Sequence, residues 1–130
     1  LEYRTDSAGA GAFRGGLGTE TLIRFPAGSD ERLYACVQGL RHPPAGIADG
    51  GAAAPASVHV TETGSMAQID AVEQDRPLMA GAEVRIVTPG GGGWGDPRAR
   101  TQERVRADVL DGYVSSDQAV TVYGLDGGEG

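Results

Sequence analysis

Alternation of apolar and polar residues predicts a series of short β-strands in the first two thirds of the chain. Residues 19–25, 57–62 and 83–87 alternate between apolar and polar side chains, which is the period of a strand with one buried face. Residues 32–40 are apolar on both faces, which indicates a strand in the middle of a sheet. Residues 66–72 give a further strand signal whose phase is poor.

The pattern changes to a helical one near the C-terminus. Thr101 can cap a helix that runs to Leu110, with apolar residues four positions apart and Gly112 as the stop. A Ser-Ser-Asp-Gln run then predicts a second short helix over residues 116–123, which Gly124 ends.

Together these signals predict a mostly β fold, a sandwich or distorted barrel of about six short strands, with two short C-terminal helices. We assign residues 1–98 to the β domain, which includes a glycine-rich loop at 88–97. Residues 99–124 hold the two helices of the same domain, and the acidic, glycine-rich residues 125–130 are expected to form a flexible tail.

The glycine-rich loop joins the most regular strand to the helical region and reads TPGGGGWGDP. Such a run costs much conformational entropy on folding, so a role as a mere spacer is disfavoured. The single tryptophan of the chain, Trp94, lies inside the loop. Asp96, which precedes a proline, is expected to cap the turn and accept backbone N–H groups of the loop, with a role as a base as the weaker alternative.

Gly90, Gly92 and Gly95 formally match the dinucleotide-binding fingerprint, but the context excludes that function. In a Rossmann unit a helix begins within the motif, whereas here Asp96 and a proline intervene and place a negative charge where a phosphate would bind. A phosphate-binding loop with a Gly-Lys pair is also excluded, because the chain has no lysine.

Composition and charge exclude further classes of protein. The chain has 11 Arg against 18 Asp and Glu and a formal net charge of −7, so the basic footprint of a nucleic-acid-binding protein is missing. No stretch approaches the roughly 18 apolar residues of a membrane span. The lone Cys36 lies in an apolar run, which predicts a buried, reduced thiol and a cytoplasmic protein.

Few polar residues are candidates for a functional site, and each of them also has an ordinary structural interpretation. His59 alternates with apolar residues and is expected to be solvated, whereas His42, between Arg41 and two prolines, could face a cleft. Arg14 either pairs with an acid or a partner or is an exposed loop charge. The histidines and Cys36 share no metal-type spacing, and we assign no catalytic residue, metal site or cofactor to this chain.

Several ordered motifs resemble the hydantoinase B subunits, the C-terminal half of ATP-dependent 5-oxoprolinase and the related acetone and acetophenone carboxylase subunits. Residues 88–97 look like the signature near the C-terminus of these proteins. Residues 3–18 are similar to the family stretch LRPDSGGAGRYRGGLG, and residues 41–51 to RxxxPPxGxxGG. Residues 78–83 are like the LKPGD entry to a strand, although Ala82 and Glu83 replace its Gly-Asp pair, and residues 109–124 are like the closing DVRxGYVSxExAxxxYG.

The resemblance implies that this chain is the C-terminal domain or small subunit of an ATP-dependent cyclic-amide hydrolase. ATP and a divalent metal are implied for the parent complex, whose metal ligands belong to its larger N-terminal part. The implied partners are that N-terminal part and a nucleotide-binding hydantoinase A-type subunit. The alternatives are a stand-alone accessory subunit of a related ketone carboxylase complex and a non-catalytic interaction module.

In this interpretation the chain has structural and subunit-interface roles and is not catalytic alone. The residues expected to line a cleft or an interface are Arg14, Arg41, His42, Gly90, Gly91, Gly92, Gly93, Trp94, Gly95 and Asp96.

Overall fold

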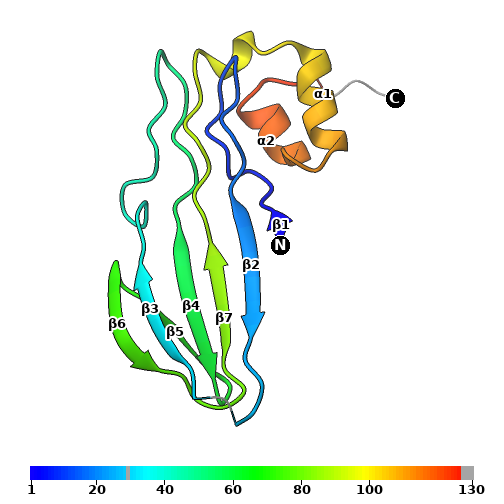
Figure 1. Ribbon diagram of the computed structural model, residues 1–130. Coiled ribbons are helices and arrows are strands. Elements are labelled where there is room, and N and C mark those ends of the chain that lie inside the picture. Colours follow the sequence, from blue (N-terminus) through cyan, green and yellow to red (C-terminus); the bar gives the residue numbers. More distant parts are fainter. Residues whose placement is uncertain (29, 127–130) are drawn as a thin grey trace.

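The computed structural model describes residues 1–28 and 30–126 of the chain and consists mostly of antiparallel strands (Figure 1). The strands are β1 (Glu2–Tyr3), β2 (Thr19–Arg24), β3 (Arg32–Cys36), β4 (Ser57–Glu62), β5 (Ser65–Gln68), β6 (Val72–Pro77) and β7 (Glu83–Val87). The helical elements are a short 3-10 turn, η1 (Pro97–Ala99), followed by α1 (Gln102–Leu110) and α2 (Ser116–Thr121).

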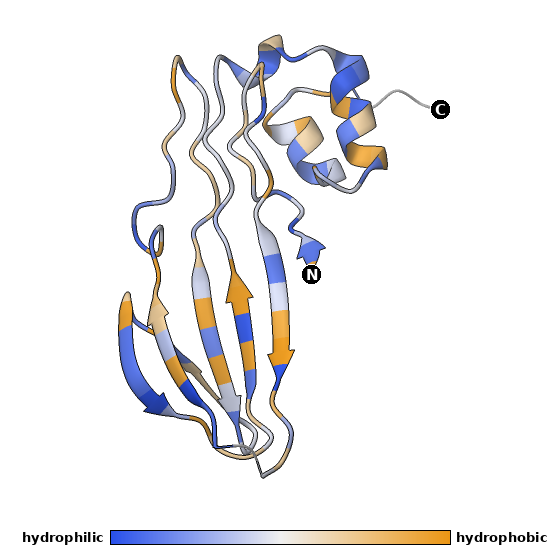
Figure 2. Cartoon of the chain, in the orientation of Figure 1, coloured by the Kyte–Doolittle hydropathy of each residue, from blue (hydrophilic) through white to orange (hydrophobic). Residues whose placement is uncertain are grey.

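The strands form an open two-layer sandwich. One layer is a five-stranded sheet in the order β1-β2-β7-β4-β5, and the other is a two-stranded ribbon of β3 and β6. Figure 2 shows the apolar and polar residues alternating along β4 and β7. The apolar face of these strands meets the ribbon, and burial of each valine there contributes about 1.5–3 kcal/mol. The buried core residues are Val58, Val60, Ile69, Leu78, Ala82 and Val84.

Sequence patterning was wrong about the strand at residues 32–40. The strand β3 ends at Cys36 and pairs with β6 alone, so it lies in the ribbon and not in the middle of a sheet. One face of a two-stranded ribbon meets water, and Tyr34 and Cys36 both lie on that face. The expected buried thiol is therefore an exposed one.

Residues 66–72 do not form one continuous strand, which explains why their apolar residues do not alternate regularly. The strand β5 ends at Gln68 and β6 begins at Val72, and Ile69 between them turns into the core with 1% of its surface exposed. Within the described residues neither sheet closes on itself, so of the two predicted alternatives, a sandwich and a distorted barrel, the structure adopts the sandwich.

Beyond one end of the sandwich, extended segments without regular strands run side by side (Figure 1). We call them the glycine bundle and define it as residues 7–18, 39–54 and 88–95. Residues 7–18 lead into β2, residues 39–54 lead toward β4, and residues 88–95 continue β7. The bundle is therefore an extension of three neighbouring strands of the sheet.

Residues 88–95 occupy the centre of the glycine bundle. The N–H of Gly91 donates to the carbonyl of Gly16, and the N–H of Gly93 donates to the carbonyl of Gly51, both at 2.9 Å. These two bonds reach the other two segments, which also bond directly to each other, because the N–H of Gly51 donates to the carbonyl of Ala10 at 2.7 Å. Backbone hydrogen bonds of this kind replace the side-chain packing that an ordinary core provides.

Glycine is required in the bundle because the backbones approach too closely for a side chain. A Cβ atom on Gly92 would lie 2.6 Å from the carbonyl carbon of Ala45, and one on Gly90 would lie 2.7 Å from the carbonyl carbon of Ser7. Ordinary van der Waals contact of a Cβ atom begins at 3.4 Å. The glycine run is therefore what allows these backbone segments to pack so closely.

The two helices lie beside the bundle and have their own small core (Figure 1). Both predicted caps are confirmed, because the Thr101 hydroxyl accepts the N–H of Arg104 at 3.4 Å and the Ser115 hydroxyl accepts the N–H of Gln118 at 3.2 Å. Gly112 ends the first helix with φ at 75°. The buried residues of this second core are Val105, Val114, Ala119 and Tyr123.

The expected flexible tail is hydrogen-bonded at its first two residues. The N–H of Leu125 donates to the carbonyl of Ala119 at 2.8 Å, and the N–H of Asp126 donates to Oε1 of Gln102 at 3.3 Å. The remainder of the predicted tail, residues 127–130, lies outside the described residues.

Candidate functional site

The glycine-rich loop that stands out in the sequence faces other backbone over most of its length. Gly90, Gly92 and Gly93 each lie against a backbone carbonyl group of a neighbouring segment. Gly91 is less crowded, because the atom nearest to a Cβ added there would be the Gly16 nitrogen at 3.2 Å. Gly95 has φ at 77°, the left-handed region that favours glycine. These residues hold the bundle together and present no reactive side chain.

Near the end of the loop, Trp94 meets two apolar residues from the other two segments of the bundle. It pairs through its backbone with Phe13 on one side and Ile47 on the other. The rings of Phe13 and Trp94 are 5.6 Å apart between centroids. We call these three residues the apolar tip.

Asp96 caps the next turn and not the glycine loop. Its Oδ1 accepts the N–H of Arg98 at 2.9 Å, which makes it the N-cap of η1. The prediction of a capping carboxylate is thus confirmed, but its partner lies after Asp96 in the chain and not before it. Asp96 itself is exposed.

Arg14 belongs to a buried charged cluster that joins the bundle to the helices. Its guanidinium lies 3.2 Å from Oδ1 of Asp108, and Arg100 approaches Oδ2 of the same carboxylate at 2.9 Å. The side chains are 17%, 8% and 10% exposed for Arg14, Asp108 and Arg100, respectively. The guanidinium of Arg14 also stacks over the ring of Tyr113, 5.3 Å from its centroid. Of the two predicted alternatives, pairing with an acid is the one that the structure adopts.

Sequence patterning gave no sign of the other members of this cluster. Asp108 occupies a buried position of α1, where the helical period would favour an apolar residue. The neighbouring Tyr123 is also buried, and that burial raises the pKa of its hydroxyl above the usual value, while the positive charge of Arg100 acts against the shift. Two guanidinium groups and one carboxylate leave the cluster with an excess positive charge.

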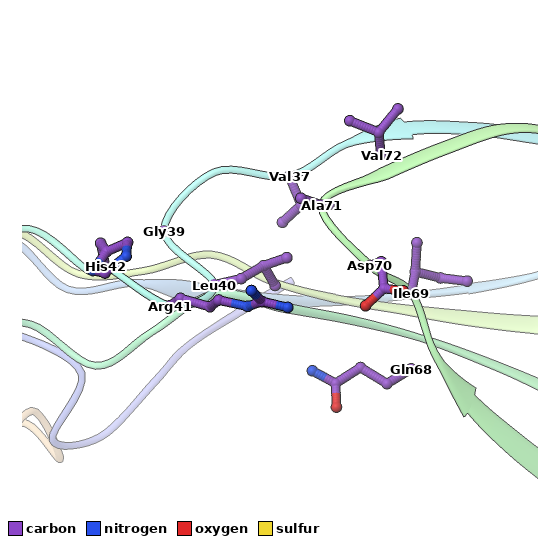
Figure 3. Close-up of a pocket in the computed structure, with 10 residues that line it drawn as sticks. All are labelled: Val37, Gly39, Leu40, Arg41, His42, Gln68, Ile69, Asp70, Ala71 and Val72. Atoms are coloured by element: carbon purple, nitrogen blue, oxygen red, sulfur yellow. The ribbon is translucent and has the colours of Figure 1, made fainter.

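Arg41 and His42 lie in a different place, at an open cleft of about 700 Å³ between the ribbon and the end of β5 (Figure 3). Figure 3 shows Arg41 extending toward the side of the cleft that carries Gln68 and Asp70. In the described part of the chain, the side chains of Arg41 and His42 have no hydrogen-bond or ion-pair partner. The apolar wall of the cleft includes Leu40 and Ile69.

The structure therefore separates the predicted site residues other than Asp96 into three groups. Arg41 and His42 face the cleft, Arg14 is in the charged cluster, and the glycines with Trp94 form the bundle and its tip. None of the residues that line the cleft belongs to the glycine-rich loop. Phe13 and Ile47 were not predicted as site residues, because neither belongs to a periodic segment.

His59 is half-buried, and the expectation of a solvated side chain was wrong. Its Nδ1 is buried without a hydrogen-bond partner among the described residues. Over those residues, no group of three or more His, Cys, Asp and Glu side chains is arranged to hold a metal ion. No helix in the described parts of the chain has the length and apolar character needed to cross a membrane.

Comparison with known proteins connects this architecture to a family. The family model described as Hydantoinase B/oxoprolinase matches residues 1–97, which include the whole sandwich and every segment of the glycine bundle. The chain belongs to the hydantoinase B/oxoprolinase family.

Individual relatives of this hydantoinase B-type domain support the same assignment. The chain is 31% identical to the B subunit of the "Putative D-/L-hydantoinase" of Pseudomonas sp. (strain NS671), covering 95% of this chain and 21% of that protein. It is 37% identical to the beta chain of the caprolactamase of Pseudomonas jessenii, covering 93% of this chain and 21% of that protein. The chain thus spans about a fifth of the length of the curated relatives it matches.

A solved structure shares the fold. A nucleotide-free structure of acetone carboxylase superposes with a TM-score of 0.78 at 22% identity, over 95% of this chain and 20% of that one. The bundle and sandwich described above are therefore a unit that recurs within a much larger polypeptide.

Proposed function

We propose that this hydantoinase B-type chain is the C-terminal domain of a larger subunit that takes part in ATP-dependent hydrolysis of a cyclic amide. The observation that carries the proposal is the family match over residues 1–97, together with relatives of which the chain covers only 21%. Hydantoin and caprolactam, the compounds in the names of those relatives, are both cyclic amides. We infer that the remainder of the subunit supplies the reacting groups and the site for a divalent metal.

The geometry favours a structural and interface role for this domain. The interior of the glycine bundle consists of backbone groups that already bond to one another, so it offers no free acid, base or nucleophile. The buried charged cluster around Asp108 is used to join the bundle to the helices. The apolar tip and the cleft at Arg41 and His42 are both available for contact with a partner.

A direct test compares residues 1–130 with the complete subunit, each mixed with the nucleotide-binding partner subunit. ATP-dependent ring opening of hydantoin, 5-oxoproline and caprolactam is followed by product analysis. We expect turnover only with the complete subunit. Ring opening by residues 1–130 without the remainder would contradict the proposal, as would a complete subunit that acts on none of these amides.

A variant pair tests the supporting role. We expect Gly92→Ala in the complete subunit to reduce the yield of the folded complex, because a Cβ atom there would clash with Ala45. Gly16→Ala is the control, because a Cβ atom at that position would meet nothing within 4 Å. Equal yields and equal activities of the two variants would show that the bundle is not needed for the function.

A further inference from the structure

The apolar tip exposes three large side chains at one end of the molecule. Phe13 is 58% exposed, Ile47 is 68% exposed and Trp94 is 53% exposed, although Trp94 pairs with both of the others. Scattered exposed apolar residues are ordinary on a protein surface, but a contiguous group that contains a tryptophan is typical of a contact site. The tip lies beyond the sandwich core and adds nothing to it.

The backbone around the tip is held in conformations that are unfavourable for the residues present. Ala48 and Asp49, which follow Ile47, have φ at 52° and 71°. The left-handed region costs a residue such as Ala48 about 1–2 kcal/mol, whereas an aspartate visits it more readily. The turn that follows Ile47 is therefore formed at some cost in stability.

The glycine bundle also keeps the tip rigid. Trp94 and Phe13 exchange backbone hydrogen bonds at 2.9 and 3.0 Å, and the N–H of Ile47 donates to the carbonyl of Gly93 at 2.9 Å. Side chains fixed before binding lose little conformational entropy when they are buried by a partner. The guanidinium of Arg104 stands 5.9 Å from the centre of the Phe13 ring and forms part of the rim.

The remainder of the subunit is the occupant that best fits this surface. Phe13, Ile47 and Trp94 all lie within residues 1–97, the part that the family model matches, so the tip belongs to the unit that recurs in proteins of which this chain covers 21%. The outer face of the sheet, by contrast, carries exposed ion pairs such as Arg85 with Glu20, which suit contact with water. One side of the bundle is already covered by the helices (Figure 1).

We propose that the apolar tip docks into an apolar recess on the remainder of its own subunit and so fixes the position of this domain. This inference rests on the proposed function only in assuming that the domain is part of a longer chain. The occupant is a folded protein surface of the same polypeptide, with apolar side chains facing Ile47 and Trp94.

The experiment uses the complete subunit and engineered cysteines as probes of burial. Ile47→Cys is compared with Met66→Cys, each in a Cys36→Ser background. Met66 is a matched control, because it is apolar, 66% exposed and lies in the β4–β5 hairpin at the opposite end of the sandwich. Each folded subunit is treated with a maleimide, and labelling of the engineered cysteine is followed by peptide mass spectrometry and compared with its rate in urea.

We expect the folded subunit to slow the labelling of Ile47→Cys at least tenfold more than that of Met66→Cys. A smaller difference would overturn the proposal. Protection that appears only after the nucleotide-binding partner is added would also overturn it and would assign the tip to that partner. Ile47→Asp provides a second measurement, with faster proteolytic release of this domain expected than for Met66→Asp, and equal release rates counting against docking.

The readout does not depend on catalysis. A subunit that protects Ile47→Cys but hydrolyses no cyclic amide would refute the proposed function and leave the docking intact. A subunit that is active while Ile47→Cys labels freely would refute the docking and leave the proposed function intact.

Discussion

Replacing Gly92 by alanine tests the close packing of the glycine bundle directly. The added Cβ atom would lie 2.6 Å from the carbonyl carbon of Ala45, and it must reach about 3.4 Å for ordinary contact. The carbonyl oxygen of Ala45 is nearer still, so the segments must separate by at least about 1 Å, which lengthens the two 2.9 Å bonds that Gly93 makes with Gly51 and Ile47 beyond hydrogen-bonding range. Two lost bonds in a buried setting cost roughly 1–3 kcal/mol each, so we expect a loss of about 3 kcal/mol in the free energy of unfolding.

The loss can be measured by urea denaturation of residues 1–130, followed by the fluorescence of Trp94, the single tryptophan of the chain. With a urea dependence of about 1.5 kcal/mol per molar, the midpoint should fall by about 2 M. Gly16→Ala should leave the midpoint unchanged or raise it slightly, because a Cβ atom there meets nothing within 4 Å and alanine lowers the entropy of the unfolded chain. If the two variants unfold at the same urea concentration, the close-packing explanation for the glycine run is refuted.

Three further predictions concern other features. Asp108→Asn should destabilise the chain by about 3 kcal/mol, because it leaves two buried guanidinium groups facing each other, and the same urea titration would detect it. Burial raises the pKa of Tyr123, so the unfolded chain releases this proton first. The stability due to Tyr123 should be complete below the ordinary pKa of about 10 and decline as the pH rises through it, and Tyr123→Phe should reduce the decline measured between about pH 9 and 11. Cys36 should react with a thiol reagent in the native protein at a rate close to that in urea, and a rate more than tenfold slower would contradict its exposed position.

Local patterning predicted the elements whose environment is set by neighbouring residues. The strands β4 and β7 alternate because each has one face on the core, and both helices begin at the hydroxyl caps that the sequence contains. The strand β2 was predicted as well, although its apolar residues Leu22 and Ile23 are exposed. The ribbon could not be predicted in the same way. Its pairing of β3 with β6 joins distant segments, and the apolar residues on both faces of β3 gave no indication that one face meets water.

In the candidate site, too, the features set by neighbouring residues could be predicted and those set by distant residues could not. The sequence indicated that residues 88–97 are unusual but not what surrounds them, because the partners of Gly91 and Gly93 lie far away in the chain. For the same reason the partner of Arg14 was unpredictable, since Asp108 is 94 residues away. The family resemblance, by contrast, is carried by contiguous motifs, so the sequence alone was enough to identify it.

The central position of residues 88–95 in the glycine bundle sets an order of events during folding. Residues 7–18 and 39–54 are synthesised first, but hydrogen-bond partners such as the carbonyl of Gly91 for Gly9 and the N–H of Gly93 for Gly51 do not yet exist. The strand β7, which lies between β2 and β4, is made just before residues 88–95. Closing contacts of such long sequence separation costs entropy before it gains stability, so this fold should form slowly and only after residue 95 has left the ribosome.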